Sequence, residues 1–254
     1  MSRRSRAVVV SVAVLSAVIV LAVSAVLLIP QEDSSGSAAA TQTPPTTTPT
    51  DMPSTPVPLE ALTGLLLSPA EAGAVVGTKD MTGNPDYGDK VYEAMADKAL
   101  VDESCMSLSP GLEIPYRASG FTGSRQQFLK GTDPDRKLVQ TVVSFPDTRS
   151  AAAHFTVITN RWKACANRSI NLAPVGGDPN HWNVADVVVL GAGDDAILTA
   201  SRTEEGGAGW GCRDGLAARN NIVIDFAVCG EDVPESVLPA FVEAVTGKIK
   251  MAAR

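Results

Sequence analysis

Histidine and aromatic residues are scarce in this chain of 254 residues, which holds two histidines and 5% Phe, Trp and Tyr. The chain contains no HExxH motif at His154 or His181 and no GxSxG motif around any serine, which excludes these two common signatures of zinc peptidases and of hydrolases with a nucleophile elbow. The four cysteines include no CxxC pair, which argues against a zinc site of four thiolates. With so few aromatic side chains, any core must be mainly aliphatic.

Positive charge is also limited. Lys and Arg total 21 against 28 Asp and Glu, which gives a formal net charge of -7. An acidic chain without a basic stripe argues against nucleic acid or anionic lipid as the main partner. The glycines at 191 and 193 form a GxG, but no third glycine, P-loop lysine or following helix pattern accompanies them, so this segment is predicted to be a turn and not a phosphate-binding loop.

Two sets of acidic residues, Asp194-Asp195 and Asp214/Asp225, are candidate carboxylate pairs. Either pair could serve acid–base chemistry or hold a divalent cation. Isolated acids in turns and on strand faces are more often solvated or paired with arginine. We therefore expect no catalytic residue, no metal site and no cofactor.

One long apolar run without charge occupies residues 7–29. As a helix it would be about 34 Å long, enough to cross the hydrocarbon core of a membrane. Arginines in residues 1–6 and acidic residues behind the run predict a cytoplasmic N-terminus and an exported remainder. We expect a single-pass anchor in the cell membrane. A cleaved signal peptide is the alternative, with small residues at 37–40 as a cleavage site.

Residues 30–58 consist mainly of Pro, Thr, Ser and Ala. Such a segment cannot bury enough apolar surface to offset the entropy of ordering it, so a disordered linker is predicted. Its Thr-Pro clusters are candidate sites of O-glycosylation. The remaining residues, 59–254, are long enough for one domain with a single core.

The fold class predicted for residues 59–254 is α+β, an antiparallel β-sheet with helices packed on one face. Apolar residues spaced by three and four along residues 147–166 predict a helix whose core-facing stripe includes Cys165. The β-branched segment 137–145 predicts a strand. Further predicted elements are a helical region at 59–76 broken at Ser68-Pro69, strands at 184–190 and 196–202, and a helix at 234–251.

The last hairpin predicts a disulfide pairing. If Asn220-Asn221 form a two-residue turn, the strand register places Cys212 directly opposite Cys229. Opposed β-carbons in such a pair lie about 4.5–5.5 Å apart, close to disulfide range. The register therefore predicts the pair Cys212–Cys229 and, by elimination, Cys105–Cys165. Closing the chain with these two disulfides would stabilise the folded state by on the order of 3 and 4 kcal/mol, respectively.

Strand alternation separates two faces of this hairpin. Ile222, Ile224 and Phe226 point to a core face, whereas Asp214 and Asp225 belong to a partly polar face. We expect the helices on the core face and an open, concave ligand surface on the polar face. The alternative is that this face is only solvated and that its residues bind no ligand. The candidate ligand residues are Tyr116, Arg117, Thr199, Ser201, Arg202, Arg213, Asp214 and Asp225, with Arg125 as a further neighbour.

Several segments together resemble one known family. The chain from Leu59 to Met251 is similar to the PknH-like extracellular domain of mycobacteria and their relatives. The segments that carry the resemblance are Ala152 to Phe155, Trp162 to Cys165, Gly193 to Ala196, Gly211 to Arg213 and Ile222 to Cys229. In that family the domain forms the exported sensor of a receptor Ser/Thr kinase, or occurs alone in anchored envelope proteins.

The resemblance implies an antiparallel sheet covered by helices, two disulfides, a cleft for an unidentified ligand, and no catalysis. Because few residues precede the apolar run, we expect no kinase in this chain. The predicted function is a membrane-anchored, extracytoplasmic sensor-like domain that binds a small molecule or an envelope ligand. One alternative is a structural or protein-interaction role with an envelope protein, such as a partner kinase. A more remote one is an envelope hydrolase with His154 or His181 as its base.

Overall fold

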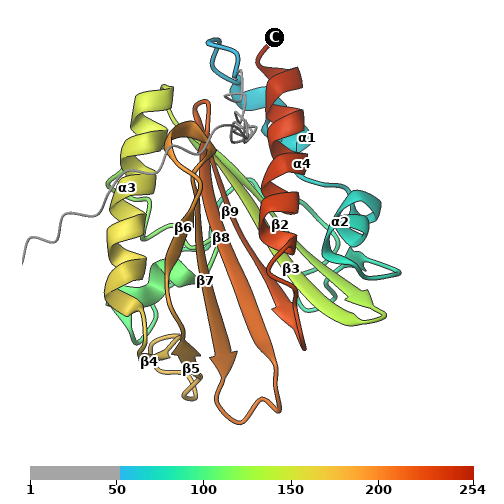
Figure 1. Ribbon diagram of the computed structural model, residues 1–254, viewed down its shortest axis with the longest axis vertical. Helices are drawn as coiled ribbons and strands as arrows, with labels where there is room; N and C mark the ends of the chain where they lie inside the picture. The colour runs from blue at the N-terminus through green and yellow to red at the C-terminus, as the bar shows by residue number, and fades with distance from the viewer. Residues whose placement is uncertain (1–51) are drawn as a thin grey trace, which may run out of the picture. The chain divides into compact units, whose positions relative to one another are not determined.

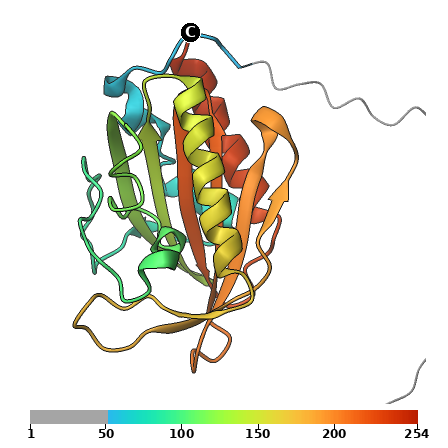
Figure 2. The same ribbon diagram turned by 90° about the vertical axis from the view of Figure 1, so that its left-hand side faces the viewer.

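A computed structural model describes residues 52–254 of the chain (Figures 1 and 2). The expected cytoplasmic head, the membrane anchor and most of the linker lie outside the described residues. Within residues 52–254, no single helix is long and apolar enough to cross a membrane. One bent pair of helices, Leu59–Leu65 with Pro69–Val76, meets the criteria of length and composition together.

An antiparallel sheet runs through the centre of the domain (Figure 1). Its strands follow the order β1-β2-β3-β9-β8-β7-β5-β4, and β6 pairs with β7 next to β5. The strands are β1 (Thr82–Gly83), β2 (Gly123–Thr132), β3 (Asp135–Ser144), β4 (Ser169–Asn171), β5 (His181–Val184), β6 (Val188–Leu190), β7 (Ile197–Glu204), β8 (Gly211–Arg219) and β9 (Ile222–Gly230).

Helices cover both faces of this sheet, not one. Helix α3 lies over one face and α4 over the other, as Figures 1 and 2 show from two directions. The short helices α1 and α2 share the face of α4. The helical elements are η1 (Leu59–Ala61), α1 (Leu62–Leu65), α2 (Pro69–Val76), η2 (Glu103–Leu108), α3 (Thr148–Cys165), η3 (Gly193–Asp195) and α4 (Val237–Ala252).

The expectation of one covered face is therefore wrong, and the composition of the hairpin explains why. Its partly polar face also carries Leu216 and Val223, which are buried in a second core cluster together with Trp162 and Ile158 of α3. On the opposite face, Phe226 stacks on Phe241 of α4 with ring centroids 4.1 Å apart. Apolar residues on both faces of a strand pair favour burial from both sides.

Local signals place the helices where the sequence predicts them. Helix α2 begins with a capping box, in which the Ser68 side chain accepts from the Glu71 amide and the Glu71 carboxylate accepts from the Ser68 amide. Asp147 caps α3 by accepting from the Ser150 amide at 2.7 Å. Such caps stabilise a helix by about 1 kcal/mol each. Helix α2 ends at Gly77, which adopts the left-handed conformation.

The predicted register of the last hairpin is confirmed. Cys212 lies opposite Cys229 in the β8–β9 ladder, and the two form a disulfide. The second disulfide joins Cys105 to Cys165, across a sequence separation of 60 residues. The segment predicted as one strand at 184–190 is interrupted at residues 185–187, which leaves β5 and β6 as separate strands along the edge of β7.

The β8–β9 turn also binds the chain that leads into the domain. The Asn220 amide donates to the Pro53 carbonyl at 3.0 Å. Asn221 exchanges two hydrogen bonds with the Val57 backbone, at 2.8 and 3.1 Å, and donates to the Phe145 carbonyl. Residues 53–57, which the sequence assigned to the linker, are thus held against the turn.

Candidate functional site

The predicted ligand residues do not share one surface. In the ladder between β7 and β8, Ala200 lies opposite Asp214, and Arg202 lies opposite Cys212. Alternation along the strands therefore directs Arg202, Asp214 and Asp225 toward α3. The same alternation sends Thr199, Ser201 and Arg213 to the face that carries α4, and these three side chains are half-buried. Arg117 is exposed in a loop, where it pairs with Asp97.

The expected open polar face is covered. Asp214 and Asp225 are 0% and 2% exposed, and Tyr116 and Arg202 are also buried. Helix α3 and the segment that contains η2 lie over this side of the sheet. The prediction of an open surface at these four residues is wrong. The apolar residues next to Asp214 and Asp225 on this face pack against α3, so the helix covers the two acids as well. Ligand binding by the eight residues stays a prediction.

The buried charges on this side are paired. The Arg202 guanidinium donates two hydrogen bonds to the Asp214 carboxylate, at 3.0 and 3.2 Å, and lies over the Trp182 ring at 4.5 Å. Burial raises the pKa of Asp214, and the Arg202 charge opposes that rise. Removing one partner of such a pair leaves an uncompensated charge in the interior.

A second buried acid, Asp225, is held by a tyrosine. The Tyr116 hydroxyl donates to Oδ2 of Asp225 at 2.8 Å. Burial raises the pKa of Asp225 to about 7, the hydrogen bond from Tyr116 opposes that rise, and the nearby Asp214 adds to it. Burial and the Asp225 charge also raise the pKa of the Tyr116 hydroxyl. Gln126 and Thr141 lie beside Asp225 in one row across the sheet. Each of these three residues holds a buried side-chain atom that has no hydrogen-bond partner within residues 52–254.

An accessible groove lies along α3, on the side of the segment 103–119. We call it the α3 groove. Its larger part encloses about 850 Å³ and its smaller part about 280 Å³, and the two parts share Pro115 and Arg161. The larger part is otherwise lined by Glu103, Ser104, Met106, Ser107, Ile114, Asn160 and Ala164, and the smaller part by Ala118, Ser119, Ser150, Ala153, His154 and Val157.

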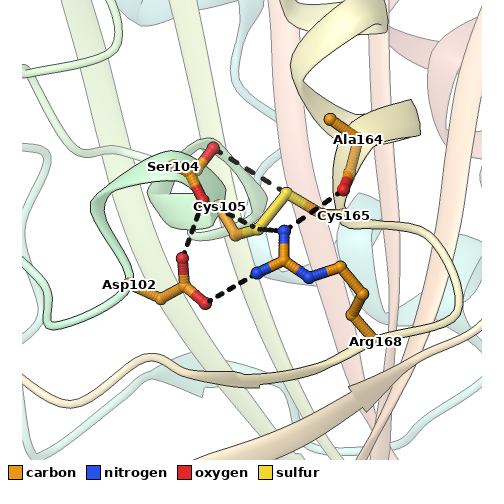
Figure 3. A network of polar contacts seen from close by, with 6 residues as sticks. All are labelled: Asp102, Ser104, Cys105, Ala164, Cys165 and Arg168. Carbon is orange, nitrogen blue, oxygen red and sulfur yellow. Dashed lines mark hydrogen bonds and ion pairs between the residues drawn. A yellow bond between two sulfur atoms is a disulfide. The ribbon is translucent and has the colours of Figure 1, made fainter.

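The long-range disulfide joins residues next to Ser104 and Ala164 in the lining of the larger part, and Figure 3 shows this bridge with its polar neighbours. Cys105 and Cys165 join η2 to the last residue of α3. Beside them, Arg168 donates to the Ala164 carbonyl at 3.2 Å and lies 3.8 Å from the Asp102 carboxylate. These bonds hold the two walls of the groove in a fixed relation.

Two buried groups of the α3 groove have unused hydrogen-bonding capacity. The Ser107 hydroxyl and Nε2 of His154 have no partner among the described residues. The His154 imidazole stacks on the Tyr116 ring at 4.4 Å. Burial, with a smaller contribution from the Arg161 charge, lowers the pKa of His154 to about 4, so the ring is neutral at physiological pH.

Comparison with known proteins assigns the domain to a family. The family described as "PknH-like extracellular domain" matches residues 57–248. This chain belongs to that family. Its curated relatives include the serine/threonine-protein kinase PknH of Mycobacterium tuberculosis (strain CDC 1551 / Oshkosh), 26% identical over 183 residues, which are 71% of this chain and 28% of the relative. PknH of Mycobacterium bovis is also 26% identical over 183 residues, which are 30% of its length.

A solved structure confirms the resemblance for the fold. The crystal structure of the extracellular domain of PknH from Mycobacterium tuberculosis matches with a TM-score of 0.68 and 25% identity, covering 78% of this chain and 99% of that one. The match covers less than a third of the length of these two curated relatives. The family description and the solved structure both name the extracellular part of PknH.

The two histidines of this PknH-like domain lack the partners that a hydrolase base needs. Within residues 52–254, no serine or carboxylate forms a hydrogen bond with His154 or with His181, which is exposed on β5. A catalytic histidine is normally oriented by an acid and contacts its nucleophile. The described part of the chain also contains no cluster of three side chains suited to bind a metal ion.

Sequence reasoning missed the α3 groove of the PknH-like domain, although one signal was present. Ala153, Val157 and Ala164 repeat at spacings of four and seven, beside the main apolar stripe of α3. Val157 is 46% exposed, so this second stripe is not used for the core. This row coincides with the α3 groove, because all three residues line it.

Proposed function

We propose that this chain is an extracytoplasmic, sensor-like domain that is anchored by residues 7–29, binds a small ligand in the α3 groove and performs no catalysis. Membership of the PknH-like extracellular family supports the placement outside the cytoplasm. The observation that carries the proposal is the α3 groove, an open volume with the exposed Arg161 at the junction of its two parts, whose guanidinium makes one hydrogen bond among the described residues. A concave site with an apolar wall and a few polar groups that face it is the usual form of a small-molecule site.

The α3 groove suits a ligand better than the acids of the sheet do. Asp214 and Asp225 already bond to Arg202 and Tyr116, and both lie beneath α3. The groove is open to solvent, and its walls are held together by the Cys105–Cys165 bridge. A fixed cavity binds without the entropy cost of ordering its walls.

Native mass spectrometry tests the proposal. The full chain is purified in detergent from the membranes of a mycobacterial host, and we expect a small-molecule adduct of constant mass. Ala153→Trp fills the smaller part of the groove and should remove the adduct. Lys163→Trp is the matched control, because Lys163 is exposed on the same helix and lines neither part. A wild-type chain that carries no adduct, or an adduct that survives Ala153→Trp, contradicts the proposal.

A protein-interaction role is the second candidate, and one observation favours it. Within the described residues, β6 pairs only with β7, and its Val188 and Leu190 are exposed. Exposed apolar residues at a sheet edge are common where a partner strand docks. Chemical crosslinking in the envelope tests this role. We expect a protein crosslink from residue 189 that disappears in the double variant Val188→Lys, Leu190→Lys, and a crosslink that persists contradicts this docking site.

A further inference from the structure

Arg161 occupies the junction of the α3 groove, because it lines both of its parts. Its guanidinium uses one donor for the Pro115 carbonyl, at 3.3 Å. Among residues 52–254, no carboxylate lies within ion-pair distance of it. Four of its five N–H donors therefore remain available at the centre of an open groove.

The charge pattern of the groove favours a single carboxylate over a phosphate. A guanidinium binds a carboxylate through two parallel hydrogen bonds. The one other basic side chain among the lining residues, His154, is neutral at physiological pH, since its pKa is lowered to about 4. Glu103 adds a negative charge to the lining of the larger part, which disfavours a ligand with several negative charges.

The two parts of the groove differ in the groups that they offer. Beside Arg161, Ala153 and Val157 give the smaller part an aliphatic wall. The larger part offers the exposed Asn160 amide, a group that hydrogen-bonds to peptide units. Among the described residues, no Phe, Tyr or Trp lines either part, so these residues offer no aromatic platform on which a nucleobase or other flat ring would stack.

We propose that the α3 groove binds a short peptide through its free C-terminal carboxylate. Arg161 takes the carboxylate, and the last side chain of the peptide lies against Val157. The backbone of the peptide runs past Asn160 toward Glu103, which accepts from its ammonium group. This assignment rests on the proposed function, because it names the ligand class for the same groove. It predicts a ligand with one charge of each sign and an aliphatic C-terminal residue.

Isothermal titration of the full chain in detergent tests the assignment. The probes are the tripeptide Ala-Ala-Val, its C-terminal carboxamide and its N-acetyl form. The wild-type chain should bind the free acid at least about tenfold more tightly than the carboxamide, the factor expected for one charge-assisted pair. In Arg161→Gln the acid and the carboxamide should bind equally, whereas Arg161→Lys should keep part of the preference. The matched control Lys163→Gln should behave as wild type.

The N-acetyl tripeptide tests the contact between Glu103 and the ammonium group of the peptide. Acetylation should weaken binding to the wild type by about tenfold and have no effect in Glu103→Gln. Arg161 and Glu103 are both exposed, so neither substitution disturbs the core. The assignment is overturned if the wild type binds none of the tripeptides, if it binds acid and carboxamide equally, or if Arg161→Gln keeps the preference. The two proposals can fail separately. If mass spectrometry finds an adduct that Ala153→Trp removes but the tripeptide titration fails, the proposed function stands and only the assignment of a peptide ligand is refuted.

Discussion

The buried carboxyl of Asp225 should make the domain less stable as the pH rises. Its pKa in the folded chain is about 7, against an ordinary value of 3.8. Between these pH values the folded chain holds a proton that the unfolded chain has released, so the free energy of unfolding falls with rising pH. The loss begins near pH 4 and is complete above pH 7. Between pH 4.5 and pH 8 it amounts to about 3 kcal/mol.

Asp225→Asn removes this titration and retains an oxygen that accepts from Tyr116. Urea unfolding of residues 52–254, followed by tryptophan fluorescence, measures the difference in the free energy of unfolding between variant and wild type at both pH values. Subtraction removes the contributions of all other groups that titrate alike in both chains. We expect the difference to shift by about 3 kcal/mol in favour of the variant at pH 8. A difference that stays constant with pH, as expected for the exposed control Asp178→Asn, would refute the reasoning.

Two further substitutions test the interior. Gly111 has a φ of 79°, and Gly111→Ala would place a β-carbon 1.3 Å from the side-chain amide nitrogen of Gln126. The control Gly120→Ala has a similar φ of 75° but open space around the new β-carbon, so it should lower the free energy of unfolding by roughly 1–2 kcal/mol. Urea unfolding should show a much larger decrease for Gly111→Ala. Equal losses would mean that the contact with Gln126 is unimportant. Arg202→Met should lower the free energy of unfolding by about 3–5 kcal/mol, because it leaves the buried Asp214 carboxylate unpaired. Adding Asp214→Leu to this variant should restore most of the lost stability. A double-mutant cycle without coupling would contradict this.

Local sequence patterns predicted the parts of the fold that local interactions determine. The Asn220-Asn221 turn fixes the register of the last hairpin, and with it both disulfides. The apolar spacing of α3 and the Ser68 cap likewise act within a few residues. The family resemblance, which is confirmed, rested on these same segments.

Features that depend on the packing of distant segments were missed. Strand β2 has a mostly polar sequence and pairs with β3 along its whole length, so its pattern gives no strong β signal by itself. The second covered face arises because α3 folds back over Asp225 and its apolar neighbours. The α3 groove needs η2 beside α3, a contact made by residues about sixty positions apart.

The hydrogen bonds between the β8–β9 turn and residues 53–57 determine where a mechanical load on the N-terminal side of the domain would act. Strands β8, β9 and β3 are neighbours in the middle of the sheet, and Asn221 connects the first two to the third through Phe145. Tension arriving through residues 53–57 would first act on the side-chain hydrogen bonds of Asn220 and Asn221, which join these residues to the turn between two central strands. The load would pass to the chain beyond Val57 only after these bonds had broken.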